Sequence, residues 1–388
     1  MSQFKIKVGV DYRSALVNRE GIGRYTRELV RALLLLEDDF DLSLFGFTFA
    51  KKKFTSQQLG IAGTKAQLER MRIPSRFLPW IMKRMKRGAD DLLGGCHIYH
   101  HTQPNLLDIS NAIEVATIFD CIYTLDAGYM EPAAAERMTQ VAFRQVRRAK
   151  RILVPCQFVG AEVVMGLGAH PGSIVVTQLG CEHVLRHMPK DGFPKAKDPY
   201  LLTVCRVDPR KNHLRILQAF ELLVRDGYPQ RWVIAGPRGW RADIFEQALA
   251  DSPARKRVQW LGDVSEAELT KLYSQADALL FPSLNEGFGL PPLESMACGT
   301  PVVTSPITAT GEICEGAAMM VEPTDVEDIY LATKKLLDNR DIYDELVGLG
   351  RERAAEYNWE RCAKQTLMAY QGTVMKRGDG DPKLHYHL

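Results

Sequence analysis

The chain has 388 residues, of which 46% are hydrophobic and 25% are charged. This composition excludes a disordered or fibrous protein, and the length exceeds the roughly 100 to 200 residues of a typical domain, so two domains are expected. The formal net charge is +3, set by 50 basic and 47 acidic residues, which gives no general attraction to nucleic acid. Any positively charged binding surface must be local.

Cysteine usage and the N-terminus predict a cytoplasmic protein. The eight cysteines form no C-x-x-C pair and most lie in apolar stretches, as buried core residues in a reducing compartment do. The apolar stretch before Asp11 is shorter than the roughly 7 to 15 residues that a signal peptide needs. No run approaches the ~20 apolar residues of a membrane span.

The first half of the chain alternates strand and helix patterns. Ile6–Val10 is typical of a strand, a loop with Gly21 and Gly23 follows, and Arg24–Leu36 has apolar residues at helical spacing. Further strands are predicted at Leu42–Phe47, Ile98–His100, Val115–Phe119 and Arg151–Pro155. This order indicates a doubly wound sheet, which binds ligands at the carboxyl ends of its strands.

A second series of the same kind follows the polar, proline-bearing segment Pro189–Pro199, which we interpret as a linker. Its strands are predicted at Tyr200–Cys205, Trp232–Ala235, Val258–Leu261, Ala278–Phe281 and Pro301–Thr304. Its helices are predicted at His213–Arg225, Asp243–Ala250, Ser265–Gln275, Pro292–Ala297 and Asp325–Leu337. We therefore expect a first domain at 1–195, a second at 196–357, and a C-terminal helix at 358–375 that crosses back onto the first domain.

The most informative stretch runs from Phe281 to Pro301. A strand ends at Phe281, a glycine loop follows, and a helix begins near Pro291–Pro292, where proline suits the first turn. Helix N-termini carry unpaired N–H groups and partial positive charge, and Gly287 and Gly289 let the backbone approach an anion closely. The stretch predicts a phosphate site.

Two carboxylates flank this predicted anion site. Because carboxylates do not bind phosphate, Glu286 and Glu294 are better placed to accept hydrogen bonds from sugar hydroxyls on either side of a diphosphate. One would hold the transferred sugar and the other the ribose. The alternative is that Glu286 caps the helix and Glu294 is a solvated helical residue.

Two cations follow the first strand of the second series. Arg206 and Lys211, with Arg210 beside them, lie where that strand meets its first helix. A transition state that expels a nucleotide diphosphate gains negative charge, and fixed cations stabilise that charge more than the ground state. Each cation taken alone would be an ordinary surface residue. Together with the two glutamates they favour a donor-binding edge.

Five stretches resemble the family-four retaining glycosyltransferases, which have the GT-B fold. They are GIGRYTREL at Gly21–Leu29, CRVDPRK at Cys205–Lys211, IAGP at Ile234–Pro237, LGDV at Leu261–Val264 and EGFGLPPLE at Glu286–Glu294. The spacing of the two glutamates is moderately specific by itself and highly specific in combination with Arg206 and Lys211. The resemblance covers the chain from Gly21 to about Tyr370. It implies an α/β protein with two doubly wound Rossmann-like domains facing each other across a cleft.

The resemblance also implies roles for individual residues. Arg206 and Lys211 would clamp the diphosphate, and Glu294 would bind the ribose hydroxyls. The set that holds the donor sugar or encloses the donor comprises Glu286, Gly287, Phe288, Gly289, Leu290, Gly21, Gly23 and Gly236. In such enzymes the reaction is similar to a front-face displacement in which the leaving phosphate helps deprotonate the acceptor. Neither a metal nor a cofactor is expected, and the sequence has no Asp-x-Asp pair placed to hold a divalent ion.

One departure from the family pattern concerns Phe119. Many relatives have His-Asp where this chain has Phe119-Asp120, and the histidine usually touches the donor sugar. Asp120 is then the nearest polar candidate for a catalytic role beside Glu286, Arg206 and Lys211, or else a loop residue that caps the next segment. His100 and His101 end a strand and are candidates for the acceptor side, with a hydrogen-bonded structural role as the alternative.

The segment 65–87 suggests a membrane surface. It carries eight Lys or Arg residues against one acidic residue, Glu69, with aromatic and apolar residues interleaved. Such a composition suits an anionic membrane surface, and the alternative is a core-packing helix with a solvated basic face. Membrane docking would place the protein peripherally on the inner face of the plasma membrane, with a lipid-linked saccharide as acceptor.

The combined expectation is a metal-independent retaining hexosyltransferase that builds a cell-surface polysaccharide such as a lipopolysaccharide. Its partners would be a nucleotide-sugar donor and a saccharide acceptor, with no nucleic acid. GDP-mannose is the expected donor by resemblance to relatives that share the GIGRY opening. UDP-sugars are the alternative donors, because no residue identified above distinguishes guanine from uracil. The rivals are a sugar-nucleotide epimerase of the same fold and a non-catalytic sugar-nucleotide-binding partner.

Overall fold

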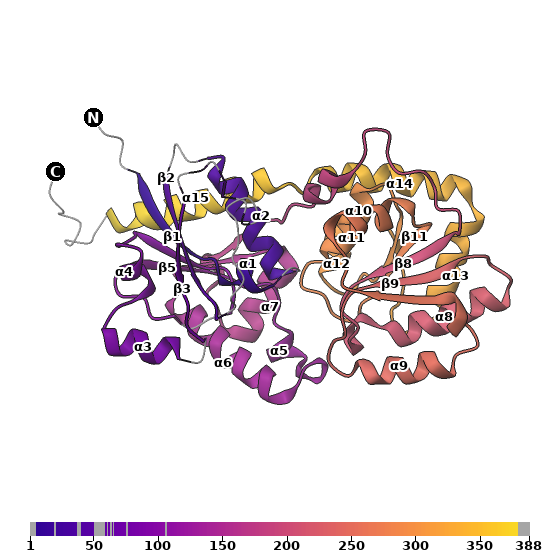
Figure 1. The fold of residues 1–388 in the computed structure, drawn as a ribbon, viewed down its shortest axis with the longest axis horizontal. Coiled ribbons are helices and arrows are strands. Elements are labelled where there is room, and N and C mark those ends of the chain that lie inside the picture. The colour runs from indigo at the N-terminus through magenta and orange to yellow at the C-terminus, as the bar shows by residue number, and fades with distance from the viewer. Residues whose placement is uncertain are drawn as a thin grey trace.

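The structure is a computed structural model that describes residues 5–18, 21–36, 40–49, 59, 61–62, 64, 66–74, 77–104 and 107–378. Two lobes lie side by side, and each is a parallel sheet with helices on both faces (Figure 1). The predicted pair of doubly wound domains is confirmed in this architecture.

The first sheet contains seven strands within the described residues, in the order β3-β2-β1-β4-β5-β6-β7. They are β1 (Ile6–Asp11), β2 (Phe40–Phe47), β3 (Gln67–Met71), β4 (Ile98–His101), β5 (Ile113–Thr117), β6 (Arg151–Val154) and β7 (Ile174–Val176). All pairings are parallel, and β1 lies between β2 and β4, with Val8 opposite Leu42 on one side and Ile98 on the other. Buried apolar residues on both faces suit strands covered by helices on either side.

Helices of the first lobe cover this sheet. They are α1 (Arg13–Val17), α2 (Ile22–Leu34), α3 (Leu78–Met85), α4 (Ala89–Leu92), α5 (Ile122–Leu125), α6 (Pro132–Arg148) and α7 (Gln157–Leu167). Helix α2 buries Leu29, Val30 and Leu33, whose spacing gives one apolar stripe. The segment 65–87 is divided between strand β3 and helix α3, and its residues Lys65 and Arg76 lie outside the described residues.

The second sheet has the order β10-β9-β8-β11-β12-β13 within the described residues. Its strands are β8 (Tyr200–Val204), β9 (Arg231–Ala235), β10 (Val258–Gly262), β11 (Ala278–Phe281), β12 (Val302–Thr304) and β13 (Met319–Met320). Its helices are α8 (His213–Arg225), α9 (Ala242–Asp251), α10 (Glu266–Gln275), α11 (Leu290–Ala297), α12 (Ala309–Ile313), α13 (Val326–Asp338) and α14 (Arg340–Ala355). The 3-10 turn η3 (Glu182–His187) lies in the connection between the lobes.

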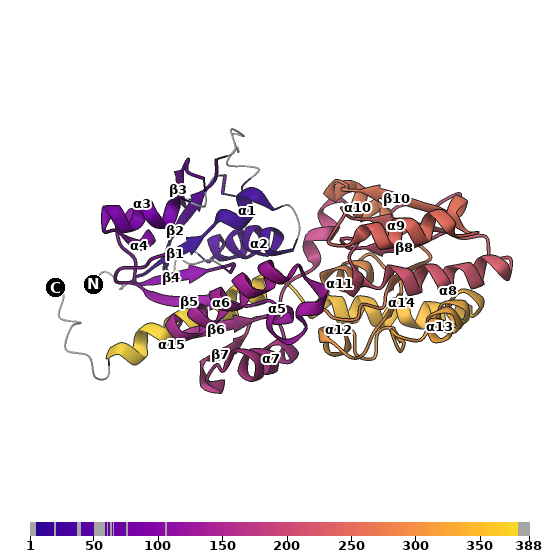
Figure 2. The same cartoon turned by 90° about the horizontal axis from the view of Figure 1, so that it is seen from below.

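The last helix, α15 (Trp359–Gly378), follows the second lobe in sequence and packs against α2 and β6 of the first. Both views show it running along the first lobe (Figure 1, Figure 2). Cys362, Ala363, Leu367 and Tyr370 are buried there. The chain therefore passes between the lobes twice.

In each sheet the strands that follow the first strand in sequence are added on one side of it and then on the other, which makes a topological switch point beside the first strand. In the second sheet this point lies between β8 and β11, where Leu202 is opposite Leu279. Open parallel sheets bind ligands at such a switch point, outside the carboxyl ends of the strands. A ligand site is therefore expected at the loops that follow β8 and β11.

Candidate functional site

The loops after β8 and β11 bring a cation and a carboxylate together. Lys211 Nζ contacts Glu286 Oε2 and lies 4.9 Å from the centre of the Phe281 ring. Arg210 Nη1 lies 3.7 Å from the same carboxylate oxygen and donates a 3.1 Å hydrogen bond to the Asn285 carbonyl. Lys211 is buried. The sequence named both partners, and the structure shows that they form one charge cluster.

The charge state of Glu286 follows from this cluster. Burial disfavours its ionised form, but Lys211 and Arg210 more than compensate and lower the pKa of the carboxyl below its usual value of 4.5. Glu286 is thus an ionised acceptor beside two fixed cations. It does not cap α11, whose N-cap is Gly289.

Gly287 lies where the two lobes approach each other closely. A Cβ atom built there would lie 2.0 Å from the Phe119 carbonyl oxygen and 2.8 Å from Cβ of Asp120. The Cys156 thiol also contacts the Gly287 carbonyl, at 3.6 Å. Only glycine allows this approach, so the end of β5 in the first lobe faces the loop that carries Glu286.

Asp120 lies near the charge cluster of the second lobe. Burial raises the pKa of its carboxyl, Arg210 opposes that shift, and the negative charge of Glu286 adds to it. Its Oδ1 accepts a long 3.4 Å hydrogen bond from the Ile122 amide, as the loop-capping alternative expects. The structure thus places Asp120 at the interface between the lobes and also gives it a local role.

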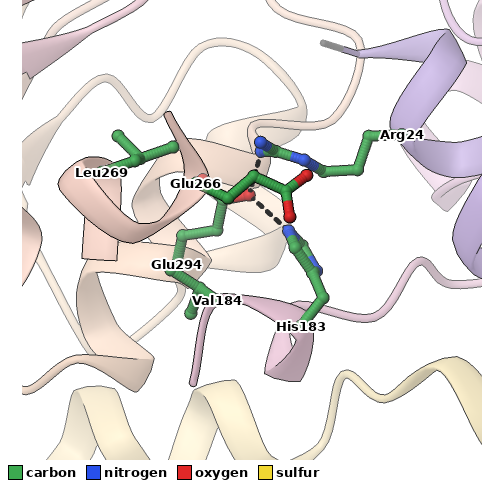
Figure 3. A pocket seen from close by; sticks show the side chains of 6 residues that line it. All are labelled: Arg24, His183, Val184, Glu266, Leu269 and Glu294. Atoms are coloured by element: carbon green, nitrogen blue, oxygen red, sulfur yellow. Dashed lines mark hydrogen bonds and ion pairs between the residues drawn. The ribbon is translucent and has the colours of Figure 1, made fainter. Parts of the chain in front are cut away.

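Glu294 is 1% exposed and accepts hydrogen bonds from three side chains. Oε1 accepts from Arg24 Nη1 at 2.7 Å and from His183 Nε2 at 2.8 Å, and Oε2 accepts from the Tyr273 hydroxyl at 2.8 Å. Figure 3 shows Arg24 reaching Glu294 from α2 of the first lobe, with His183 approaching from the connecting turn. The alternative of a solvated helical glutamate is wrong, because the side chain is enclosed.

These donors keep Glu294 ionised. Burial alone would favour the protonated form, but Arg24, His183 and Tyr273 together lower the pKa of the carboxyl to about 2. A buried, ionised carboxylate at a domain interface is a strong acceptor for hydroxyl groups.

The low pKa of Glu294 predicts how stability depends on pH. Because the folded pKa of about 2 lies below the usual 4.5, the stabilisation is complete above about pH 4.5 and is lost as the pH falls toward 2. We expect Glu294→Gln to lower the free energy of unfolding by about 3 kcal/mol at pH 7, and by less in acid. Urea unfolding of both proteins at pH 7 and pH 3.5 measures this, and an equal deficit at the two pH values would contradict it.

Arg206 is placed differently from Lys211. Its side chain is exposed, its aliphatic stem lies beside Gly239, and it forms no ion pair with any residue that the structure describes. Gly236 has a φ of 149°, and a Cβ there would lie 2.0 Å from the Cys205 carbonyl oxygen. Gly236 therefore allows the loops after β8 and β9 to pack together beneath Arg206.

The glycines before α2 differ from each other. Gly21 is exposed, has a φ of 49° and forms the N-cap of α2. Gly23 is buried, and a Cβ there would lie 2.0 Å from the Asn18 carbonyl oxygen. Gly21 thus suits the left-handed turn, and Gly23 allows α2 to pack closely against the segment that precedes it.

The remaining loop residues shape the start of α11. Gly289 has a φ of 97°, which L side chains rarely adopt, and Leu290 begins the helix. Phe288 is buried with its ring 6.0 Å from that of Tyr357, so it packs inward. Only the backbone of Phe288 is therefore available to contact a donor.

His100 and His101 take structural positions. His100 is fully buried between Thr117 and the Tyr370 hydroxyl, with both ring nitrogens 2.7 Å from these oxygens. Burial, with a smaller contribution from His101, lowers its pKa to about 3. His101 is buried too, with Nε2 3.0 Å from Glu114. These contacts fit the structural alternative for both histidines.

A second polar contact joins the lobes. Glu312 of α12 accepts hydrogen bonds from the amides of Gln157 and Phe158, at 3.0 and 2.8 Å. It therefore caps the N-terminus of α7, a helix of the other lobe. Together with the Arg24–Glu294 pair and the Gly287 contact, this cap holds the two lobes against each other.

Three partners of Glu294 were not predicted. Arg24 lies inside the GIGR motif but was not singled out, and His183 and Tyr273 belong to no motif named above. The only signal for Arg24 was a cation next to a glycine loop. Tyr273 had no signal other than its place on a predicted helix.

Two further properties of the described residues bear on the site. No group of three or more His, Cys, Asp and Glu side chains in the described ranges is arranged to hold a metal ion. None of the described helices combines the length and the apolar character needed to cross a bilayer.

Known proteins resemble this chain both in sequence and in fold. The model for glycosyl transferases group 1 matches residues 186–353. The chain is 29% identical over 370 residues to O-antigen chain mannosyltransferase B of Escherichia coli, covering 90% of this chain and 96% of the relative. It is 26% identical over 257 residues to serotype-specific mannosyltransferase WbdA of Escherichia coli, covering 65% of this chain and only 31% of that relative. Sucrose-phosphate synthase from Thermosynechococcus elongatus has the same fold, with a TM-score of 0.77 at 19% identity over 96% of this chain and 100% of the other. Residues 186–353 thus match the group 1 glycosyl transferases, and the chain as a whole has the GT-B fold.

Proposed function

We propose that this protein transfers mannose from GDP-mannose, with retention of configuration, onto a growing cell-surface polysaccharide. The interface of the lobes carries a candidate nucleotide-sugar site. A relative named as a mannosyltransferase matches this chain over 96% of the relative's length. That match is the observation that favours mannose over other hexoses.

The donor diphosphate is proposed to lie over the loop after β8. Lys211 is buried beside Glu286, and Arg206 is exposed at the same edge of the sheet. Negative charge grows on the leaving diphosphate during transfer, so two fixed cations there lower the barrier by stabilising the transition state. Glu286, held ionised by Lys211 and Arg210, would accept hydrogen bonds from hydroxyls of the transferred sugar.

The nucleoside is proposed to lie beside Glu294. Its ionised carboxylate would accept hydrogen bonds from the ribose, in the place that Arg24 occupies in the structure. The backbone of Gly287–Leu290 at the start of α11 would face the donor, with Gly21 and Gly23 enclosing it from the first lobe and Gly236 shaping the adjoining loop. Asp120 approaches from the first lobe, on the side where the acceptor would enter.

The direct test is a transfer assay with labelled donor. Purified protein is incubated with GDP-mannose or with UDP-glucose, UDP-galactose or UDP-N-acetylglucosamine, with an oligomannoside acceptor, and the products are separated by mass. We expect a product heavier by one hexose with GDP-mannose alone. Extension only with a UDP-sugar would replace the proposed donor. Isomerised sugar nucleotide without transfer would indicate an epimerase, and binding without turnover would indicate a non-catalytic partner.

We also propose that α3 contacts an anionic membrane surface, on the inner face of the plasma membrane. Leu78 and Met82 bury one side of this short helix in the core of the first lobe. The other side exposes Trp80, which is 66% exposed, and Met85, which is 44% exposed. Exposed cations surround these apolar groups at Lys83, Arg84, Lys86 and Arg87. An aromatic residue among cations suits a lipid headgroup region, and a lipid-linked acceptor would be within reach there.

Neutralising the α3 cations is expected to release the protein from vesicles. Each cation near an anionic surface contributes about 1 kcal/mol, so changing all four to Gln should reduce binding to phosphatidylglycerol-containing vesicles at least tenfold in co-sedimentation. The control changes four exposed cations of the interlobe connection and the second lobe to Gln, namely Lys190, Arg255, Lys256 and Lys271. Equal binding by the two variants would contradict the proposal.

A further inference from the structure

The three donors to Glu294 differ in how they are attached. His183 lies on η3 and Tyr273 on α10, and both of these elements pack directly against α11, which carries Glu294. Arg24 comes from α2 in the other lobe. Turn η3 is also held to α2, because Arg186 forms an ion pair with Glu28. The donor that a ligand would displace is therefore the long Arg24 side chain, while His183 and Tyr273 come from elements packed against α11.

The orientation of His183 is determined by a neighbour. The Trp359 indole N–H donates a 3.1 Å hydrogen bond to His183 Nδ1. Because an indole can only donate, Nδ1 must accept, and the ring proton is placed on Nε2, which points at Glu294 Oε1. Trp359 is itself fixed at the start of α15, where its amide donates to Glu182 Oε1 at 2.7 Å. The chain of contacts from Trp359 through His183 aims a single donor at Glu294.

The acceptor positions that remain on Glu294 match a vicinal diol. An ionised carboxylate accepts about four hydrogen bonds, two at each oxygen. His183 takes one position on Oε1 and Tyr273 takes one on Oε2. Arg24 fills the second position on Oε1. Once Arg24 has left, one position is open on each oxygen, as two neighbouring hydroxyl groups require.

The surroundings of these positions are partly polar and partly apolar. A small hollow beside the carboxylate is lined by Arg24, His183, Val184, Glu266, Leu269 and Glu294 (Figure 3). Val184 and Leu269 supply its apolar wall, and the two glutamates lie on its polar side. With Arg24 in place the hollow has room for about one water molecule, so a ribose enters only where the Arg24 side chain has moved away.

We propose that His183, held by Trp359, is a positioning residue that fixes the Glu294 carboxylate to receive the 2′- and 3′-hydroxyls of the donor ribose. The proposal rests on the proposed function, in which Glu294 binds the nucleoside. His183 acts through the carboxylate. It occupies one acceptor position and holds the carboxylate plane so that the two open positions face the hollow.

The test compares ribonucleotides with their 2′-deoxy forms in matched variants. Dissociation constants of GDP, 2′-deoxy-GDP, UDP and 2′-deoxy-UDP are measured by calorimetry. We expect the wild type to favour the ribose form of the base it binds by about tenfold, since one hydrogen bond to a charged group is lost in the deoxy form. His183→Phe should reduce that preference below threefold. His183→Gln should restore it, because the amide nitrogen reaches the place of Nε2.

The comparison separates positioning from simple support of the fold. A structural role alone would weaken the ribose and deoxy forms equally, and an unchanged tenfold preference in His183→Phe would overturn the proposal. If that variant does not fold, Trp359→Phe removes only the indole donor and should lower the preference at least twofold, and no change there would equally overturn it. His187→Gln, at an exposed position in the same turn, is the control and should match the wild type. Failure of the wild type to bind any of the four nucleotides would instead remove the proposed function itself.

Discussion

Replacing Gly287 by alanine is expected to reduce sugar transfer about 100-fold while both lobes stay folded. The added Cβ would lie 2.0 Å from the Phe119 carbonyl oxygen, a distance that no pair of non-bonded atoms tolerates. The lobes must then stay further apart, and a displacement of about 1 Å at a reacting centre can reduce a rate by 10²-fold. The backbone of Gly287 is not in the left-handed region, so alanine adds no local strain.

Two measurements isolate this effect. Small-angle scattering should show a larger radius of gyration for Gly287→Ala, with a thermal midpoint near that of the wild type. The matched control is Gly348→Ala in α14, where an added Cβ meets nothing within 4 Å and alanine favours the helix. Full activity in Gly287→Ala would show that the closed contact between the lobes is not needed for the reaction.

Removing the charge of Lys211 is expected to have the largest effect on catalysis. Lys211→Met eliminates a buried cation next to Glu286, and the loss of one preorganised stabilising group typically reduces kcat by about 10²- to 10³-fold. The same substitution leaves the half-buried Glu286 with only the more distant Arg210. The variant should therefore also be less stable, by roughly 3 kcal/mol, because an unpaired buried charge is unfavourable.

The double variant separates these two consequences. Lys211→Met combined with Glu286→Gln removes both charges, so the free energy of unfolding should recover toward the wild-type value. Activity should stay at the level of the single variant or below it, because neither charge is available to the donor. Urea unfolding and steady-state kinetics on the wild type, Lys211→Met, Glu286→Gln and the double variant give the comparison. Recovery of activity together with stability would mean that the pair is only structural.

The sequence predicted most of the sheet architecture because buried parallel strands are short apolar runs. The strand at Ala278–Phe281 was predicted with the bounds that the structure gives it. Strands β3, β7 and β13 were missed. Strand β3 is the polar edge strand Gln67–Met71, in which no residue is buried, and β7 and β13 are only three and two residues long. None of them is long enough or apolar enough to give the periodic signal on which such predictions depend.

The sequence also predicted the part of the site that lies at the ends of strands. Glu286 and Lys211 follow the carboxyl ends of two strands, and the topology makes those strands neighbours. The partners of Glu294 come from distant segments, with His183 111 residues away and Arg24 270 residues away. A local sequence pattern carries no information on contacts between distant segments of the two lobes. Arg206 was named with Lys211, but the structure leaves it exposed while Lys211 is buried.

The central claim is that the loops after β8 and β11 bind a nucleoside diphosphate, and calorimetric titration with GDP, GMP, UDP and UMP tests it most directly. We expect the wild type to bind the diphosphate of one base at least tenfold more tightly than its monophosphate, and Lys211→Met to reduce that ratio below about threefold. If none of the four nucleotides binds, or if Lys211→Met leaves the ratio unchanged, then this edge of the second lobe is not the diphosphate site.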